Sequence, residues 1–151
     1  MLKEIVMNLS KLMSVIPLFI LILILYNVMI LIGVDFGECT AQTAECAVTS
    51  LFFFFLPSRK DWAPTWSSLI LMFGVMILYI ELVKSTKTGS ITLIEHALSM
   101  VVFIACLMEF ILVDKAGTST FLIITLMSLL DVVAGFTITV ASARRDFTMG
   151  G

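Results

Sequence analysis

Apolar residues occupy four long runs along the chain, and short polar stretches separate each run from the next. The runs extend over about residues 13–34, 66–83, 91–113 and 118–141. A helix needs about 20 mostly apolar residues to cross the hydrocarbon core of a bilayer. We therefore predict an all-α integral membrane protein, a four-transmembrane-helix bundle that forms a single domain over residues 1–151.

A fifth apolar run, residues 47–56, is too short to cross a bilayer as a helix. It includes four consecutive phenylalanines at positions 52–55. A short apolar segment of this kind is typical of a helix that lies in the membrane interface. We predict a short extracytoplasmic interfacial segment, either helical or dipping into the membrane. The alternative is a hydrophobic loop packed on the bundle.

Composition supports the membrane interpretation. Hydrophobic residues make up 60% of the chain and charged residues 13%, whereas soluble domains have roughly 25% charged residues. The mean hydropathy is +1.14, and a soluble domain of this length has too little interior for so much apolar surface. The net charge of −2 gives no indication of a nucleic-acid partner. Lipid is therefore the expected environment.

The distribution of basic residues predicts the orientation, because four spans place both termini on one side. Six basic residues would share the side of the termini: Lys3, Lys11, Lys84, Lys87, Arg144 and Arg145. Three would lie on the other side: Arg59, Lys60 and Lys115. Basic loops remain preferentially in the cytoplasm, so both termini are predicted to be cytoplasmic, in a bacterial inner membrane. The first run exceeds the 7–15-residue core of a signal peptide, so we expect an uncleaved signal anchor.

Two tryptophans flank the predicted outer end of the second span. Trp62 and Trp66 would lie at the depth of the lipid headgroups, where the amphipathic indole ring is favoured. We interpret both as interfacial anchors.

Two of the three cysteines lie close together in the first outer loop. Cys39 and Cys46 would face an oxidising compartment, which permits a disulfide between them. The alternative is two free thiols. Cys106 lies inside the third run, and we interpret it as a small packing residue.

Asp131 lies near the centre of the fourth run. A carboxylate at that depth costs roughly 2.5–3.5 kcal/mol on insertion scales, so it usually faces a protein neighbour, a water cavity or an ion path. On a helix, Ser128 shares the face of Asp131, together with small residues that let helices approach closely. Two interpretations remain open: an interhelical hydrogen bond from a protonated Asp131, or a site for a proton or another cation.

A second polar group lies at the inner ends of the second and third runs. The short connection 84–90 would bring Glu81, Glu95 and His96 to a similar depth. In one interpretation, Thr92 and Glu95 form a capping box, and His96 is a surface or interface residue. In the other, His96 relays protons, because its charge changes near neutral pH.

Glu109 lies about one turn inside the predicted outer end of the third span. It could pair with Lys115, or its carboxylate could reach the aqueous phase. A series from Glu109 through Asp131 to Glu95 and His96 would cross the membrane in steps, which makes it a candidate proton route. This route requires that the side chains face one another.

The sequence contains no complete motif for nucleophilic catalysis, phosphate binding or metal ligation. We therefore expect no cofactor and no enzymatic activity. Our first hypothesis is a non-catalytic accessory or assembly subunit of a larger membrane complex, with other membrane subunits or further copies of itself as partners. The alternative is a small oligomeric transporter or channel, coupled to protons or cations through Asp131. An enzyme acting on lipid or quinone would depend on Glu81, Glu95 and His96.

Overall fold

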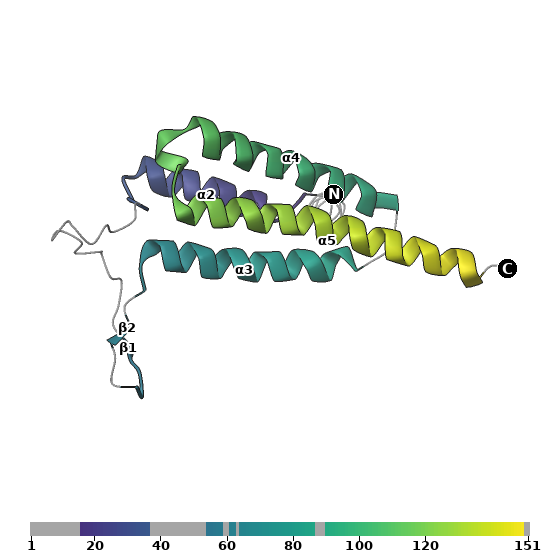
Figure 1. The fold of residues 1–151 in the computed structure, drawn as a ribbon, viewed down its shortest axis with the longest axis horizontal. Helices are drawn as coiled ribbons and strands as arrows, with labels where there is room; N and C mark the ends of the chain where they lie inside the picture. Colours follow the sequence, from purple (N-terminus) through teal and green to yellow (C-terminus); the bar gives the residue numbers. More distant parts are fainter. Residues whose placement is uncertain (1–15, 37–53, 59–60, 63, 87–89, 150–151) are drawn as a thin grey trace, which may run out of the picture.

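The computed structural model describes residues 16–36, 54–58, 61–62, 64–86 and 90–149. Within these residues the chain forms four α-helices: α2 (Ile20–Leu31), α3 (Trp66–Ser85), α4 (Ser90–Leu112) and α5 (Ser119–Met149). Each helix runs opposite to the one before it, so the helices form an antiparallel bundle (Figure 1). α5 packs on both α3 and α4. We call the end of the bundle where α3 ends and α4 begins the α3–α4 end.

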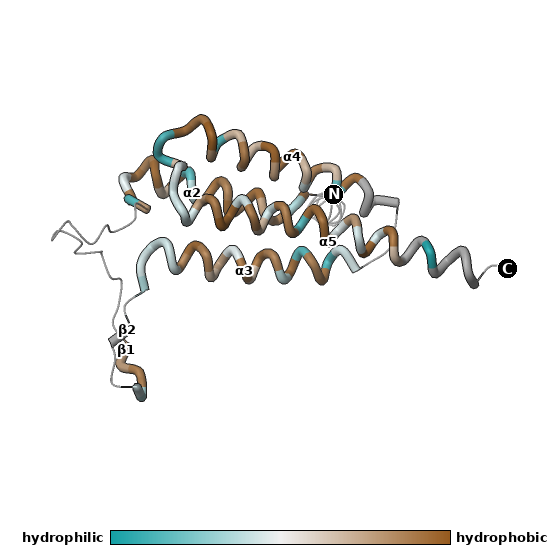
Figure 2. The backbone as a smooth tube through the Cα atoms, viewed as in Figure 1, coloured by the Kyte–Doolittle hydropathy of each residue, from teal (hydrophilic) through white to brown (hydrophobic). Residues whose placement is uncertain are grey.

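Three helical segments are long and apolar enough to cross a membrane: Trp66–Ser85, Ile94–Leu112 and Ser119–Ala141. Apolar residues predominate along all three (Figure 2). Many large apolar side chains point away from the bundle, including Leu112, which is 68% exposed. This part of the chain confirms the prediction of a mostly helical protein whose helices suit a bilayer in length and composition.

The first helix is shorter than the predicted span of residues 13–34. α2 has 12 residues, and residues 13–15 lie outside the described part of the chain. Pro17 precedes the helix and has no amide hydrogen to donate. At the other end, Gly33 adopts a φ of +90°, which is open to glycine at little cost. The amides of Gly33 and Val34 then donate to carbonyl groups of the last turn at 3.1 and 2.9 Å, as in a Schellman motif.

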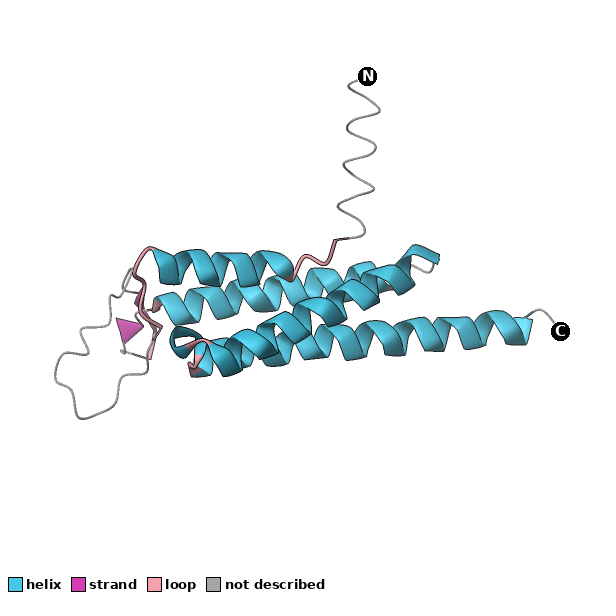
Figure 3. Cartoon of the chain, turned by 90° about the horizontal axis from the view of Figure 1, so that it is seen from above, coloured by secondary structure: helices cyan, strands magenta, loops and turns pink. Residues whose placement is uncertain are grey.

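The last helix is longer than its predicted span. α5 has 31 residues and continues past Ala141, the last residue of its apolar segment. It therefore projects beyond the other helices at the α3–α4 end (Figure 3). At its start, the Thr118 hydroxyl accepts a hydrogen bond from the amide of Phe121 at 3.2 Å, which satisfies one free donor of the first turn. A 3-10 turn, η1 (Asp114–Ala116), connects it to α4.

A two-stranded hairpin replaces part of the predicted interfacial helix. β1 (Phe54–Phe55) pairs antiparallel with β2 (Asp61–Trp62), and the chain turns at residues 57–58. Pro57 explains why the apolar run does not continue as a helix. Phe55 is 85% exposed, so the alternative of a loop packed on the bundle does not hold for this residue either. Residues 47–53 lie outside the described part of the chain.

The hairpin projects sideways from the bundle near the start of α3 (Figure 1). Trp62 stands opposite Phe54 in the register, with their ring centroids 6.3 Å apart. Trp66 begins α3 and packs against the core. The predicted pair of tryptophans therefore lies where the hairpin meets the bundle, and Trp62 is 43% exposed.

Three packed aromatic rings stabilise the half of the bundle that lies opposite the α3–α4 end. The ring of Tyr26 packs between Phe36 and Phe121, with ring centroids 4.6 and 4.5 Å away. Its hydroxyl forms a 2.9 Å hydrogen bond with that of Thr118. All three rings are at most 3% exposed, and such aromatic contacts contribute about 0.5–1.5 kcal/mol each beyond their buried area.

Candidate functional site

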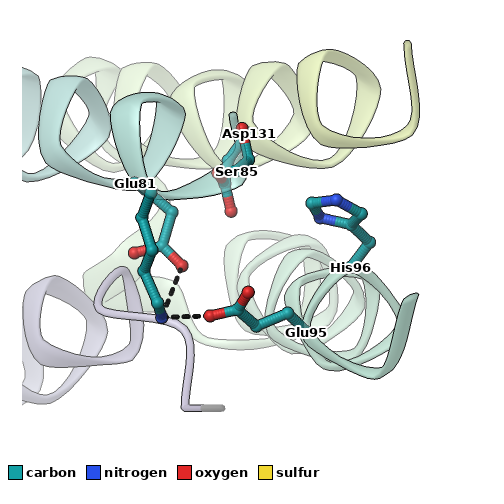
Figure 4. A pocket seen from close by; sticks show the side chains of 6 residues that line it. Glu81, Ser85, Glu95, His96 and Asp131 are labelled. Atoms are coloured by element: carbon teal, nitrogen blue, oxygen red, sulfur yellow. Dashed lines mark ion pairs between the residues drawn. The ribbon is translucent and has the colours of Figure 1, made fainter. Parts of the chain in front are cut away.

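Five ionisable side chains from three helices meet at one point near the α3–α4 end (Figure 4). They are Glu81 and Lys84 of α3, Glu95 and His96 of α4, and Asp131 of α5. We call these five residues the ionic cluster. The three carboxyl side chains and the imidazole belong to residues that are at most 6% exposed. Charges at such positions must be paired or neutralised, because desolvation penalises them heavily.

The short connection between α3 and α4 explains how two neighbouring helices contribute four of the five residues. α3 and α4 both pack on α5 and are joined by a short connection, so Glu81 and Glu95 come to a similar depth, as predicted. Asp131 reaches them from the adjacent helix α5. The predicted capping box is wrong: α4 begins at Ser90, so Thr92 lies inside the helix and cannot be its N-cap residue.

Lys84 is the central positive charge of the cluster. Its Nζ forms an ion pair with Oε1 of Glu95 and lies 3.8 Å from Oε1 of Glu81. It also donates a hydrogen bond to the carbonyl oxygen of Ile16 at 3.2 Å. Oε1 of Glu95 is buried and has no hydrogen bond to any described residue, so the ion pair with Lys84 is its electrostatic compensation. Sequence reasoning had assigned Lys84 to the loop, although its i, i+3 spacing from Glu81 was a signal for pairing.

Glu81 links the cluster to α2. Its second oxygen, Oε2, accepts a hydrogen bond from the backbone amide of Leu18 at 3.0 Å. Leu18 lies just before α2, where backbone amides lack partners within the helix. A carboxylate at this end of a helix is also favoured by the helix dipole. One buried side chain therefore serves both α2 and the ionic cluster.

His96 is held against α5 by a hydrogen bond and by close packing. Its Nε2 lies 2.9 Å from the hydroxyl oxygen of Thr139, and that hydroxyl donates to the carbonyl of Gly135 at 3.0 Å. Because a threonine hydroxyl has one hydrogen, this arrangement assigns Nε2 of His96 as the donor. The imidazole ring lies directly on Gly135, where a Cβ atom would overlap it, and next to Phe136, with ring centroids 5.7 Å apart.

Asp131 finds its polar neighbours inside its own chain. Ser99 and His96 of α4, together with Lys84 and Glu95, lie close enough to its carboxyl group to interact with it electrostatically. Ser128 shares the buried face of α5 but is not part of the cluster: its hydroxyl donates to the carbonyl of Thr125 at 2.7 Å. Sequence reasoning missed Ser99, whose i, i+3 spacing from His96 places it on the same side of α4.

Glu109 lies apart from the ionic cluster. Its carboxyl group lies close to the Asn27 side chain of α2, and its Oε1 is buried without a hydrogen bond to any described residue. The structure thus gathers Glu81, Glu95, His96 and Asp131, and leaves Glu109 in a separate polar contact. The possible disulfide between Cys39 and Cys46 lies outside the described residues.

The pocket lined by the cluster is filled by its own side chains and leaves no room for a molecule as large as water. Among the described residues, no group of histidine, cysteine and carboxylate side chains has the arrangement of a metal site. No family model matches the chain, and neither a curated protein nor a solved structure matches it.

Proposed function

We propose that the protein is a small proton-coupled membrane transporter or channel, with the ionic cluster as its proton-binding site. The observation that supports this proposal is the imbalance of charge at a buried point. Three carboxyl groups face one ammonium group and one imidazole, so fully ionised carboxylates outnumber the positive charges even when His96 is protonated. Ionisable residues at membrane depth commonly form proton relays.

The internal pairing of Asp131 favours this proposal over the assembly hypothesis. A mid-membrane acid that contacts a partner subunit should point out of its own bundle. Asp131 is instead 3% exposed, and its carboxyl group lies close to Ser99 of a neighbouring helix. The bundle itself therefore surrounds this carboxyl group.

Proton flux into proteoliposomes tests the proposal. The purified protein is reconstituted with a pH-sensitive dye inside, and a potassium diffusion potential supplies the driving force. We expect the wild-type protein to carry protons and Asp131→Asn to abolish the flux. Thr137→Val is the matched control, because Thr137 is an exposed residue of the same helix. A flux that persists unchanged in Asp131→Asn contradicts the proposal.

The second candidate is a non-catalytic accessory subunit of a larger membrane complex. Two observations favour it: the filled pocket, which suits a structural ionic contact between helices, and the projection of α5 beyond the bundle (Figure 3). Residues 142–149 offer a partner a helical surface beyond the apolar segment. Affinity purification from native membranes with mass spectrometry would then recover a partner in stoichiometric amount.

We also propose that the α3–α4 end faces the bacterial cytoplasm and that the hairpin lies at the extracytoplasmic surface of the inner membrane. The excess of basic residues on the side of the termini supports this orientation. Single cysteines at Ser58 and Thr86, both exposed positions, test it with a membrane-impermeant thiol reagent after Cys39, Cys46 and Cys106 have been replaced by serine. The reagent should label Ser58→Cys in intact cells, and Thr86→Cys after permeabilisation. The reverse pattern would contradict the orientation.

A further inference from the structure

Two polar contacts hold the segment that leads into α2, and both come from charged residues of the ionic cluster. Oε2 of Glu81 accepts the amide hydrogen of Leu18 at 3.0 Å. Nζ of Lys84 donates to the carbonyl oxygen of Ile16 at 3.2 Å. The two side chains lie one turn apart on α3, so they contact the same short stretch of backbone on either side of Pro17.

The strength of the contact between Glu81 and Leu18 depends on the charge of the Glu81 carboxyl group. A hydrogen bond to a charged group is stronger than one between neutral groups, and it is shorter and better defined. Glu81 is 5% exposed, so water does not replace the contact while the bundle stays packed. A proton on the carboxylate would weaken the bond to Leu18 and remove the attraction to Lys84.

The opposite half of α2 is held by different groups. Tyr26 packs between two aromatic rings and forms a hydrogen bond with Thr118. Those contacts involve none of the five cluster residues. The two halves of α2 are therefore attached to the bundle by independent means, one of them sensitive to the protonation of the cluster.

We propose that Glu81 couples proton binding in the cluster to a movement of the start of α2, an inference that rests on the proposed function. When Oε2 takes up a proton, the carboxylate becomes a neutral acid, Leu18 loses its charged acceptor, and Lys84 keeps Glu95 as its ionic partner. The start of α2 then separates from α3 while Tyr26 holds the other half in place. Such a movement would open the cluster to water at the α3–α4 end.

Among the residues that the structure describes, the charged groups that face Glu81 belong to the cluster itself. Lys84 lies on the same helix, Glu95 and His96 on α4, and Asp131 on α5. From the described part of the α2 side, the contact is the backbone amide of Leu18. Protonation at Glu95 or Asp131 changes the charge around Glu81 but leaves the bond to Leu18 in place, which separates the role of Glu81 from theirs.

Hydrogen–deuterium exchange of the full-length protein, read by mass spectrometry, tests the coupling. Glu81→Gln keeps the size of the side chain and imitates the neutral acid. We expect peptides covering residues 16–22 to exchange about tenfold faster in this variant, because a charged hydrogen bond is replaced by a neutral one. Asp131→Asn is the matched control: it removes a cluster charge of the same kind from a residue that is not the ion-pair partner of Lys84 and does not contact the α2 segment. Its exchange in residues 16–22 should equal that of the wild type.

Lys84→Gln provides a second variant, because it weakens the contact to Ile16 and keeps the Glu81 side chain. It should also speed exchange in residues 16–22. Unchanged exchange in both Glu81→Gln and Lys84→Gln would overturn the coupling, as would an equal acceleration in Asp131→Asn. Flux measurements separate the two proposals: proton flux with unchanged exchange removes the coupling alone, whereas faster exchange in a protein without flux removes the transport function on which it rests.

Discussion

At the scale of single residues, Lys84 balances a surplus of buried acid. Its ammonium group lies between Glu81 and Glu95, both of which are buried. Removing one member of a buried ionic group leaves its partners uncompensated, which is more harmful than replacing the whole group by apolar residues. The stability of the bundle should therefore respond strongly to this one side chain.

We predict that Lys84→Met lowers the free energy of unfolding by about 3–5 kcal/mol at neutral pH. Methionine keeps the length of the side chain but not its charge. The loss should shrink at acidic pH, because protonated carboxyl groups need no counter-charge. Unfolding in detergent micelles measures it, with Lys115→Met on the exposed η1 turn as the control. Equal effects of the two substitutions would show that Lys84 does not stabilise the cluster.

Gly135 sets the position of His96. A Cβ atom at this residue would overlap the imidazole ring, so we expect Gly135→Ala to cost about 1–3 kcal/mol, as overpacked cores do. Gly117→Ala is the matched control, since its Cβ would meet its nearest neighbour at 3.4 Å. Unfolding midpoints of the single variants and of the double variant Gly135→Ala with His96→Ala test the mechanism. If the double variant does not recover part of the stability lost in Gly135→Ala, the overlap with His96 is not the cause of that loss.

The sequence identified most members of the cluster, because acids and a histidine stand out in apolar runs. Glu81, Glu95, His96 and Asp131 were singled out for this reason. Lys84 was missed because a basic residue at the end of a span looks like a loop charge. The capping box at Thr92 was wrong because the helix begins earlier. Whether side chains face each other depends on the rotation of packed helices, which hydropathy does not determine.

At the scale of elements, hydropathy located the helices and failed where the backbone makes a local turn. α3, α4 and the apolar part of α5 match their predicted spans closely, because a helix satisfies all its backbone hydrogen bonds within an apolar run. α2 is shorter than its run because Pro17 and Gly33 act at its ends. The phenylalanine run contains the strand β1, which pairs with β2 several residues downstream. Hydropathy did not predict this strand because it does not report pairing with a separate segment.

The hairpin leads to a prediction about lipid contact. Phe54 and Phe55 are 58% and 85% exposed, and aromatic side chains favour the membrane interface. In the variant Trp66→Phe, Trp62 is the single fluorescent tryptophan. Its fluorescence should be quenched in liposomes that contain lipids brominated near the headgroup. Replacing both phenylalanines with serine should reduce the quenching. Quenching that does not change on this replacement would mean that the hairpin is held at the interface by other residues.

At the scale of the whole molecule, the α3–α4 end combines the features on which both functional proposals depend. The ionic cluster lies near this end (Figure 4), the segment that leads into α2 contacts it, and α5 projects beyond it (Figure 3). The cluster belongs to the bundle, whereas residues 142–149 extend beyond its apolar segment. The two proposals can therefore be separated by a change that disrupts the projection and leaves the bundle intact.

Asp146→Pro makes this separation. Proline inside a helix removes the hydrogen bond to the residue four positions earlier, here Ser142, and costs about 3 kcal/mol or more locally, so α5 should break in the turn 142–146, past Ala141. Arg144 and Arg145 remain in place, which preserves the basic charges expected to set the orientation. If the cluster acts in proton transport, flux in proteoliposomes should stay close to that of the wild type. If the protein is an accessory subunit that uses the projecting helix, affinity purification should lose the partner while the bundle still unfolds cooperatively. Loss of flux in a folded variant would instead assign the projection to the transport process, and Thr148→Pro near the end of the helix is the control for a nonspecific effect of proline.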